Sequence, residues 1–123
     1  MQKDPILDAL AKASKDLLFP SETEAELVPF AWTGGEPLTA ERLLTLSGTP
    51  ADTAVEKTPL ADLWRTVPSE DRARFLALGK TLDGQLTDIQ AYKVGDEAEK
   101  TVYIVGKTKD GRWAGLKTIV VET

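Results

Sequence analysis

The sequence contains no cysteine and no histidine. The first absence excludes disulfide bonds, thiol nucleophiles and thiolate metal sites. Together the two absences exclude the Ser-His-Asp and Cys-His catalytic constellations, the usual zinc sites and the commonest general base near neutral pH. Any catalysis would therefore have to rest on carboxylate, lysine, arginine, tyrosine or serine side chains.

Long apolar runs and an excess of positive charge are absent as well. The apolar runs are short, such as Ile-Val-Val at residues 119–121, whereas a helix that spans a bilayer needs about 20 apolar residues. Residues 1–5 lack the apolar region of a secretory signal, so we expect a cytoplasmic protein that does not contact membranes. The net charge of −5 argues against direct binding of nucleic acid, because phosphate binding requires a basic face.

The negative charge is concentrated in one part of the chain. Residues 16–41 contain six carboxylates and no lysine or arginine. Such a segment can steer a positively charged partner toward the protein. The alternative is a solvated, charge-rich turn without a partner, which is the commoner meaning of a run of charge.

The composition that remains is typical of a globular protein. With 123 residues, 41% of them hydrophobic and 28% charged, the chain is predicted to form one domain over residues 1–123. A chain of this length buries about two thirds of the surface that its unfolded form exposes. That is enough for a cooperative core, so no metal ion or cofactor is needed to explain folding.

The first two thirds of the chain are predicted to be mostly helical. Apolar residues recur at helical spacing from Pro5 to near Leu18, and Pro20 ends that helix. A strand is predicted over residues 27–32, where Pro29 indicates an edge position. Further helices are predicted over residues 39–47, around residues 60–64 and from about residue 69 to 82, with a short extended piece at residues 53–57.

The last third is predicted to form a β-meander. Three segments at residues 89–94, 101–105 and 113–121 have strand composition, and Asp110-Gly111 is a hairpin signal. The middle segment is apolar on both faces, and a sheet covered on both faces requires helices on each side. The predicted fold class is therefore α+β, a three-layer α/β/α sandwich with a mostly antiparallel sheet.

Several local sequences, taken in their order along the chain, carry more information than any one of them alone. They are Leu17-Leu18-Phe19-Pro20-Ser21-Glu22, Phe30-Ala31-Trp32, Leu43-Leu44-Thr45-Leu46-Ser47-Gly48, Tyr92 with Gly95, Val102-Tyr103-Ile104-Val105-Gly106-Lys107-Thr108, Ala114-Gly115-Leu116 and Val120-Val121-Glu122-Thr123. In this order they resemble the nuclease A inhibitor family. The resemblance covers most of the chain, is strongest over the last thirty or so residues, and is weak between Pro50 and Leu86.

The resemblance implies a protein that binds a magnesium-dependent, sugar-non-specific nuclease and blocks its active site, on a fold like that of the PR-1 proteins. In the family, the terminal Thr reaches the nuclease's magnesium ion and a Glu in the turn after the first helix contacts the same centre. The matching positions are Thr123 and Glu22. Magnesium prefers hard oxygen ligands, which both residues supply. The implied complex is 1:1, with an inhibitor that is a monomer when free and has no cofactor of its own.

Three further acidic residues complete the predicted partner-binding set, namely Glu24, Glu122 and Asp71. The family also uses an Asp-Trp pair in the loop before its long helix. The corresponding residues 66–72 form a shorter stretch without a Trp, in which Asp71 is the acid that can take the first role.

Other readings of these residues stay open. Ser21 and Glu24 have capping-box spacing, and a chain end such as Thr123 is commonly frayed. The three tryptophans are expected in the core or half-buried in the sheet. Besides the inhibitor, the alternatives are a non-catalytic binding module with a different or lost partner and, least favoured, an enzyme that uses Glu22 and Glu24.

Overall fold

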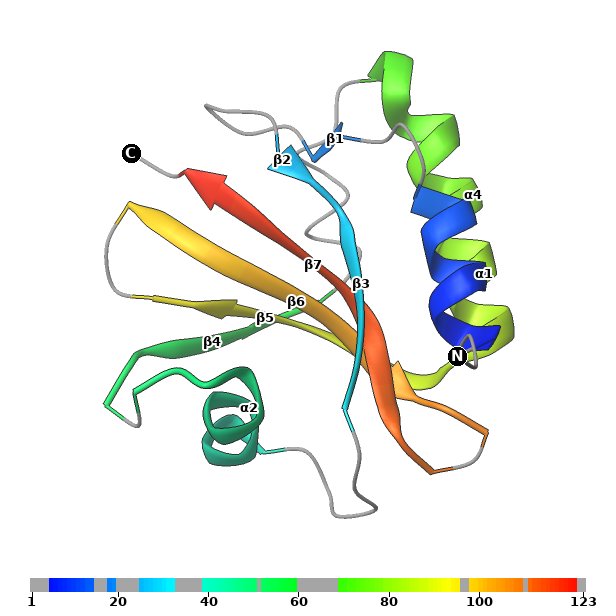
Figure 1. The fold of residues 1–123 in the computed structure, drawn as a ribbon. Helices are drawn as coiled ribbons and strands as arrows, with labels where there is room; N and C mark the ends of the chain where they lie inside the picture. Colours follow the sequence, from blue (N-terminus) through cyan, green and yellow to red (C-terminus); the bar gives the residue numbers. More distant parts are fainter. Residues whose placement is uncertain are drawn as a thin grey trace.

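The last third of the chain forms the three central strands of the sheet against which the helices pack (Figure 1). The computed structural model describes residues 5–14, 18–19, 25–32, 39–50, 52–59, 69–95, 98–109 and 111–121. Within these ranges the helices are α1 (Pro5–Ser14), α2 (Ala40–Ser47) and α4 (Ser69–Gln85). The strands are β1 (Leu18–Phe19), β2 (Ala25–Glu26), β3 (Val28–Trp32), β4 (Val55–Thr58), β5 (Thr87–Val94), β6 (Glu99–Lys107) and β7 (Trp113–Val121).

The main sheet is antiparallel throughout and has the strand order β3-β7-β6-β5-β4. The three predicted C-terminal strands are therefore confirmed. The β6–β7 hairpin is closed by the Thr108 N–H, which donates to the Arg112 carbonyl at 2.8 Å, and Gly111 has a φ of 88°. Pro29 lies in the edge strand β3, as predicted, where a missing N–H does not interrupt a ladder on both sides.

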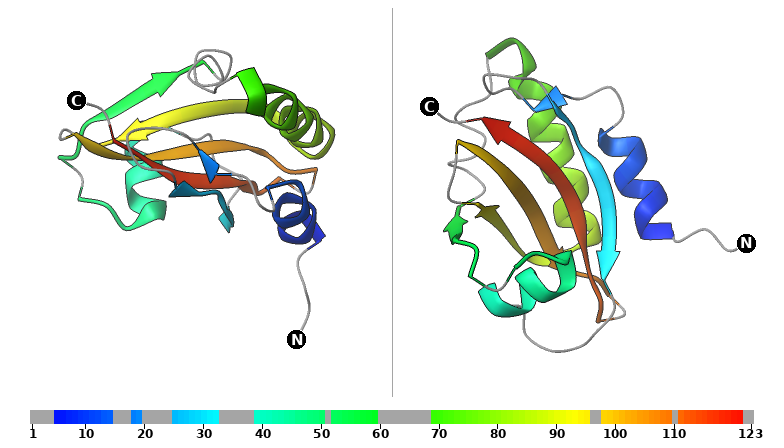
Figure 2. Two further views of the ribbon diagram at one scale, coloured as in Figure 1. Left: turned by 90° about the horizontal axis from the view of Figure 1, so that it is seen from above. Right: turned by 60° about the vertical axis from the view of Figure 1, so that its left-hand side comes forward.

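The two faces of the sheet carry separate apolar clusters. On one face, side chains such as Ile104 and Leu116 pack against Phe75, Leu78 and Leu82 of α4 and against α1. On the other, Tyr103 and Val105 lie in a cluster with Leu43 and Leu44 of α2. Figure 2 shows α1 and α4 on the opposite side of the sheet from α2. The middle strand β6 is buried on both faces, as its sequence predicted.

Helix α2 has the two ends that its sequence predicted. The Thr39 Oγ1 accepts a hydrogen bond from the Arg42 N–H at 3.1 Å, which satisfies one free donor of the first turn. At the other end Gly48 adopts the left-handed conformation with a φ of 72°, and the Thr49 N–H donates to the Leu44 carbonyl at 2.9 Å. These contacts stabilise both ends of α2, and its two buried leucines pack against the sheet.

The predicted extension of the first helix to near Leu18 is wrong. The described helix ends at Ser14, whose hydroxyl donates to the Leu10 carbonyl at 2.8 Å, and Leu18–Phe19 form β1 instead. Leu18 pairs with Glu26 and Phe19 with Ala25. Because a residue before proline disfavours helical backbone angles, Phe19 favours the extended pairing over another helical turn.

The α+β class and the antiparallel sheet are confirmed. The short extended piece near residue 55 is β4, and the helix carrying Phe75 to Leu82 is α4. Trp32 and Trp113 are half-buried against the α2-side cluster, as expected. The helical turn predicted around residues 60–64, with Trp64, lies outside the described residues. Among the described helices, none is both long and apolar enough to cross a membrane.

Candidate functional site

A short ladder precedes the main sheet and frames the turn that carries two predicted contact residues. Strands β1 and β2 pair antiparallel, so residues 20–24 connect their ends. Glu22 and Glu24 fall in this connection and lie outside the described residues. Phe19 and Ala25, which flank residues 20–24, are cross-strand partners. The connection therefore starts and ends at the same place in the fold.

The last strand leads to the other predicted contact residues. Strand β7 ends at Val121, and Glu122 and Thr123 lie outside the described residues. Both β1 and β2 contact β7. Figure 1 shows these two short strands beside the arrowhead end of β7. The described segments that flank Glu22 and Thr123 therefore lie at the same end of the sheet.

Asp71 is the one predicted contact residue that lies within the described chain. It occupies the first turn of α4 and is partly exposed. Helix α4 begins at the end of the molecule where β1 and β2 lie (Figure 1). A carboxylate in a first helical turn also stabilises the helix through the partial positive charge of the free N–H groups. Its position alone thus allows a structural as well as a binding role.

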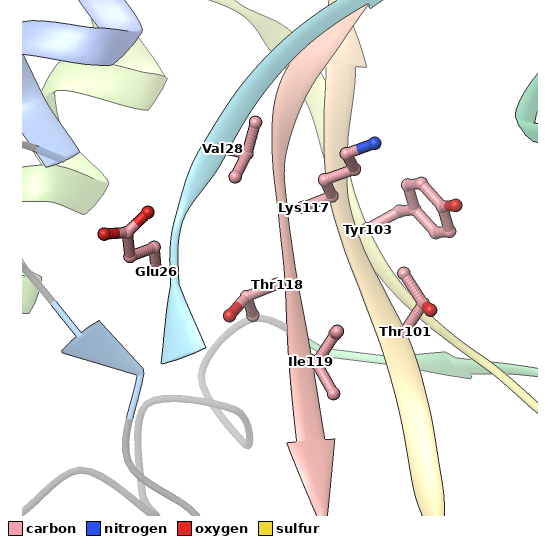
Figure 3. A pocket seen from close by; sticks show the side chains of 7 residues that line it. All are labelled: Glu26, Val28, Thr101, Tyr103, Lys117, Thr118 and Ile119. Atoms are coloured by element: carbon pink, nitrogen blue, oxygen red, sulfur yellow. The ribbon is translucent and has the colours of Figure 1, made fainter. Parts of the chain in front are cut away.

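A groove of about 420 Å³ lies next to this end of the sheet. Its lining comprises Glu26, Val28, Thr101, Tyr103, Lys117, Thr118 and Ile119. Val28 pairs with Lys117, and Lys117 pairs with Tyr103, so these three form a row across β3, β7 and β6 (Figure 3). The groove adjoins the predicted contact turn because Glu26 lies in β2, two residues after Glu24.

The groove was not predicted from the sequence. Val28 is 43% exposed and Ile119 is 41% exposed, and both line this groove. The signal that reveals them is the register, because pairing Val28 with Lys117 places Ile119 on the same face two residues further along β7. The sequence alone contains the two apolar residues but not their register.

The groove lining combines apolar side chains with one exposed cation. Valine, isoleucine and the tyrosine ring offer apolar contact, while Lys117 contributes an exposed cation. Over the described ranges, no three histidine, cysteine, aspartate or glutamate residues are gathered so as to hold a metal ion.

A family model described as nuclease A inhibitor-like protein matches residues 4–123. The chain belongs to the nuclease A inhibitor-like family. The match confirms the resemblance seen in the local sequences and extends through residues 50–86, where that resemblance is weakest. A comparison with curated proteins found no match.

Membership of the nuclease A inhibitor-like family bears on the choice between an enzyme and a binding protein. The family is named for inhibition of a nuclease, so a nuclease is the partner that membership implies. The matched range includes the turn at residues 20–24 and the residues after Val121, which are the segments that carry the predicted contacts.

Proposed function

We propose that this protein inhibits a magnesium-dependent, sugar-non-specific nuclease by binding over its active site. Family membership supports a nuclease as the partner. The observation that carries the mechanism is that β1, β2 and the end of β7 lie together. A single surface of the inhibitor can then present both the turn with Glu22 and the residues that follow Val121.

The length of the connecting chain supports this arrangement. Thr123 follows Val121, the last residue of β7, by two residues, and an extended chain spans at most about 3.6 Å per residue. Glu22 is three residues from both Phe19 and Ala25. These short connections support the proposal that both residues contact one metal centre.

Both residues supply oxygen donors to the proposed contact. The Thr123 hydroxyl and terminal carboxylate, and the Glu22 carboxylate, are hard oxygen donors of the kind magnesium takes. The ion belongs to the nuclease, and the inhibitor's oxygens would occupy positions that water or substrate otherwise fills. Glu24, Glu122 and Asp71 would add negative charge around this contact and favour a basic nuclease surface.

The arrangement of helices and sheet also agrees with this proposal. We propose the three-layer, PR-1-like arrangement for this chain, and the helices on both faces of the sheet support it. The inhibitor would be a cytoplasmic monomer that binds one nuclease molecule.

The test compares inhibition constants of matched variants toward a magnesium-dependent, sugar-non-specific nuclease. Removal of Thr123 and the substitution Glu22→Ala should each weaken inhibition by at least about tenfold, since each removes an oxygen donor from a desolvated contact. Asp83→Ala is the control, because it removes the same charge from an exposed position near the C-terminal end of α4. Unfolding temperatures should show that all variants are folded, and unchanged inhibition by the first two would refute the mechanism.

A second candidate function rests on the loop before α4. Residues 66–72 contain no Trp to match the family's Asp-Trp pair, so a different nuclease, or a different protein, is the alternative partner. Purification of complexes from the native host would distinguish the two, because the alternative recovers a protein without nuclease activity.

A further inference from the structure

Two of the largest exposed apolar side chains of the described residues share one groove. Val28 in β3 and Ile119 in β7 are exposed by 43% and 41%, and both line the groove defined above. The third exposed large apolar side chain is Leu76, which is 52% exposed and lies on α4, across the sheet from the groove. Exposed apolar surface of this kind marks binding sites when it is grouped.

The groove is left open by the way α2 packs. Leu43 and Leu44 of α2 cover Tyr92, Val94 and Val105, further along the same face of the sheet. The edge of this covered region is a set of aromatic rings, with Tyr103 lying 5.7 Å from Phe30 and 5.6 Å from Trp32 between ring centres. Since Tyr103 is held by these contacts, it forms a rigid wall of the groove.

The groove lining carries one carboxylate, Glu26, and one cation, Lys117. Lys117 is exposed in the middle of the row from Val28 to Tyr103, and it forms no ion pair with a carboxylate of the described residues. The Lys117 ammonium group beside an apolar hollow suits an incoming apolar side chain that has a carboxylate next to it.

The position of the groove selects the occupant. Glu26 in its lining lies two residues after Glu24, and Ile119 lies in the last part of β7, two residues before Val121. The groove is therefore continuous with the surface proposed to enter the nuclease's metal site. A partner seated on that surface would also cover the groove.

We propose that the groove of Val28, Tyr103, Lys117 and Ile119 is a second anchor point for the nuclease, and this inference rests on the proposed function. It receives an apolar side chain of the nuclease, whose neighbouring carboxylate pairs with the Lys117 ammonium group. The apolar contact contributes affinity, and the ion pair sets the orientation in which the two proteins dock. The volume of about 420 Å³ falls within the range of roughly 300–1,000 Å³ found for ligand pockets, so an apolar side chain has room to enter.

The experiment measures dissociation constants for a magnesium-dependent, sugar-non-specific nuclease by calorimetry. Ile119→Ala and Val28→Ala should each weaken binding by about tenfold, whereas the control Leu76→Ala should leave it within about twofold. Lys117→Glu should weaken binding more than Lys80→Glu, an exposed site on α4 with the same change of net charge. The difference in affinity loss between Lys117→Glu and Lys80→Glu should persist at high salt. Salt screens long-range attraction between the two proteins, but it screens a desolvated ion pair less.

The outcomes separate this inference from the proposed function. If the wild-type chain binds the nuclease and Ile119→Ala binds as tightly as Leu76→Ala, the groove inference is overturned and the inhibitor mechanism stands. If the wild-type chain binds no such nuclease, both are overturned. If light scattering shows a dimer of the free chain that Ile119→Ala dissociates, the occupant is a second copy of this chain and the inference is again overturned.

Discussion

Gly115 lies in β7 opposite Val105 of β6, at a point where the two strands approach closely. A Cβ atom added to Gly115 would collide with the carbonyl oxygen of Ile104 and would lie 2.8 Å from its carbonyl carbon and 3.0 Å from the Cα of Val105. All three are main-chain atoms, which cannot rotate away as the end of a side chain does. Gly115→Ala therefore forces β6 and β7 apart in the centre of the sheet.

The expected loss of stability is large for one methyl group. Overpacking a core that can adjust costs about 1–3 kcal/mol, and a collision with main chain belongs at or above the upper end of that range. We expect Gly115→Ala to lower the free energy of unfolding by about 3 kcal/mol or more. Domains are stable by about 5–15 kcal/mol, so the variant would lose a substantial share of its stability.

Gly84→Ala is the matched control. Gly84 lies in α4, and a Cβ atom there has no neighbour within 4 Å. Alanine in place of glycine within a helix should raise the free energy of unfolding by about 0.5–1 kcal/mol. The two variants add the same methyl group and should shift stability in opposite directions.

The assay is urea unfolding followed by circular dichroism at equilibrium. The slope of the unfolding free energy against urea concentration should be similar for both variants, so that the urea midpoints report stability. A loss below about 1 kcal/mol for Gly115→Ala, with an unchanged urea dependence, would show that the β6–β7 pairing differs from the register described above.

Three further predictions concern single side chains. The Thr58 hydroxyl is buried and has no hydrogen-bond partner among the described residues, so Thr58→Val should raise the free energy of unfolding by about 1 kcal/mol in the same urea assay. Burial raises the pKa of Tyr92 above 10.0, so the folded state keeps its proton at a pH where the unfolded state loses it. Stability should therefore fall as pH rises through about 10, and Tyr92→Phe should lessen this fall in urea midpoints measured from pH 8 to 11. Thr39→Ala removes the 3.1 Å bond to the Arg42 N–H and should lower stability by about 1 kcal/mol, which thermal unfolding would detect and Thr39→Ser should restore.

The elements that could be predicted from the sequence are those whose signals are local. The strand predicted at residues 101–105 has apolar residues on both of its faces, and β6 is buried on both faces. Thr39 and Gly48 mark the ends of α2 through bonds to residues three or four positions away. Such contacts depend on nearby sequence alone, so reading the residues in order is sufficient to find them.

The features that could not be predicted depend on contacts between distant residues. Leu18 fits the apolar spacing of the first helix, yet it pairs with Glu26 in β1–β2. The groove requires Val28 to face Lys117, and nothing in either local sequence sets that register. Of the predicted contact residues, Asp71 lies at the start of α4, while Glu22, Glu24, Glu122 and Thr123 stay predictions.

The strand order has a consequence for how the protein is made. Strand β7 lies between β3 and β6, although β3 comes from residues 28–32 and β7 from residues 113–121. While a ribosome is still synthesising β7, β3 has no partner and one edge of β6 remains open, with apolar side chains on both of its faces. Such an edge is prone to pair with other nascent chains, and pairing between distant segments is slow to form. Truncations that shorten β7 should therefore yield insoluble protein instead of a smaller folded one.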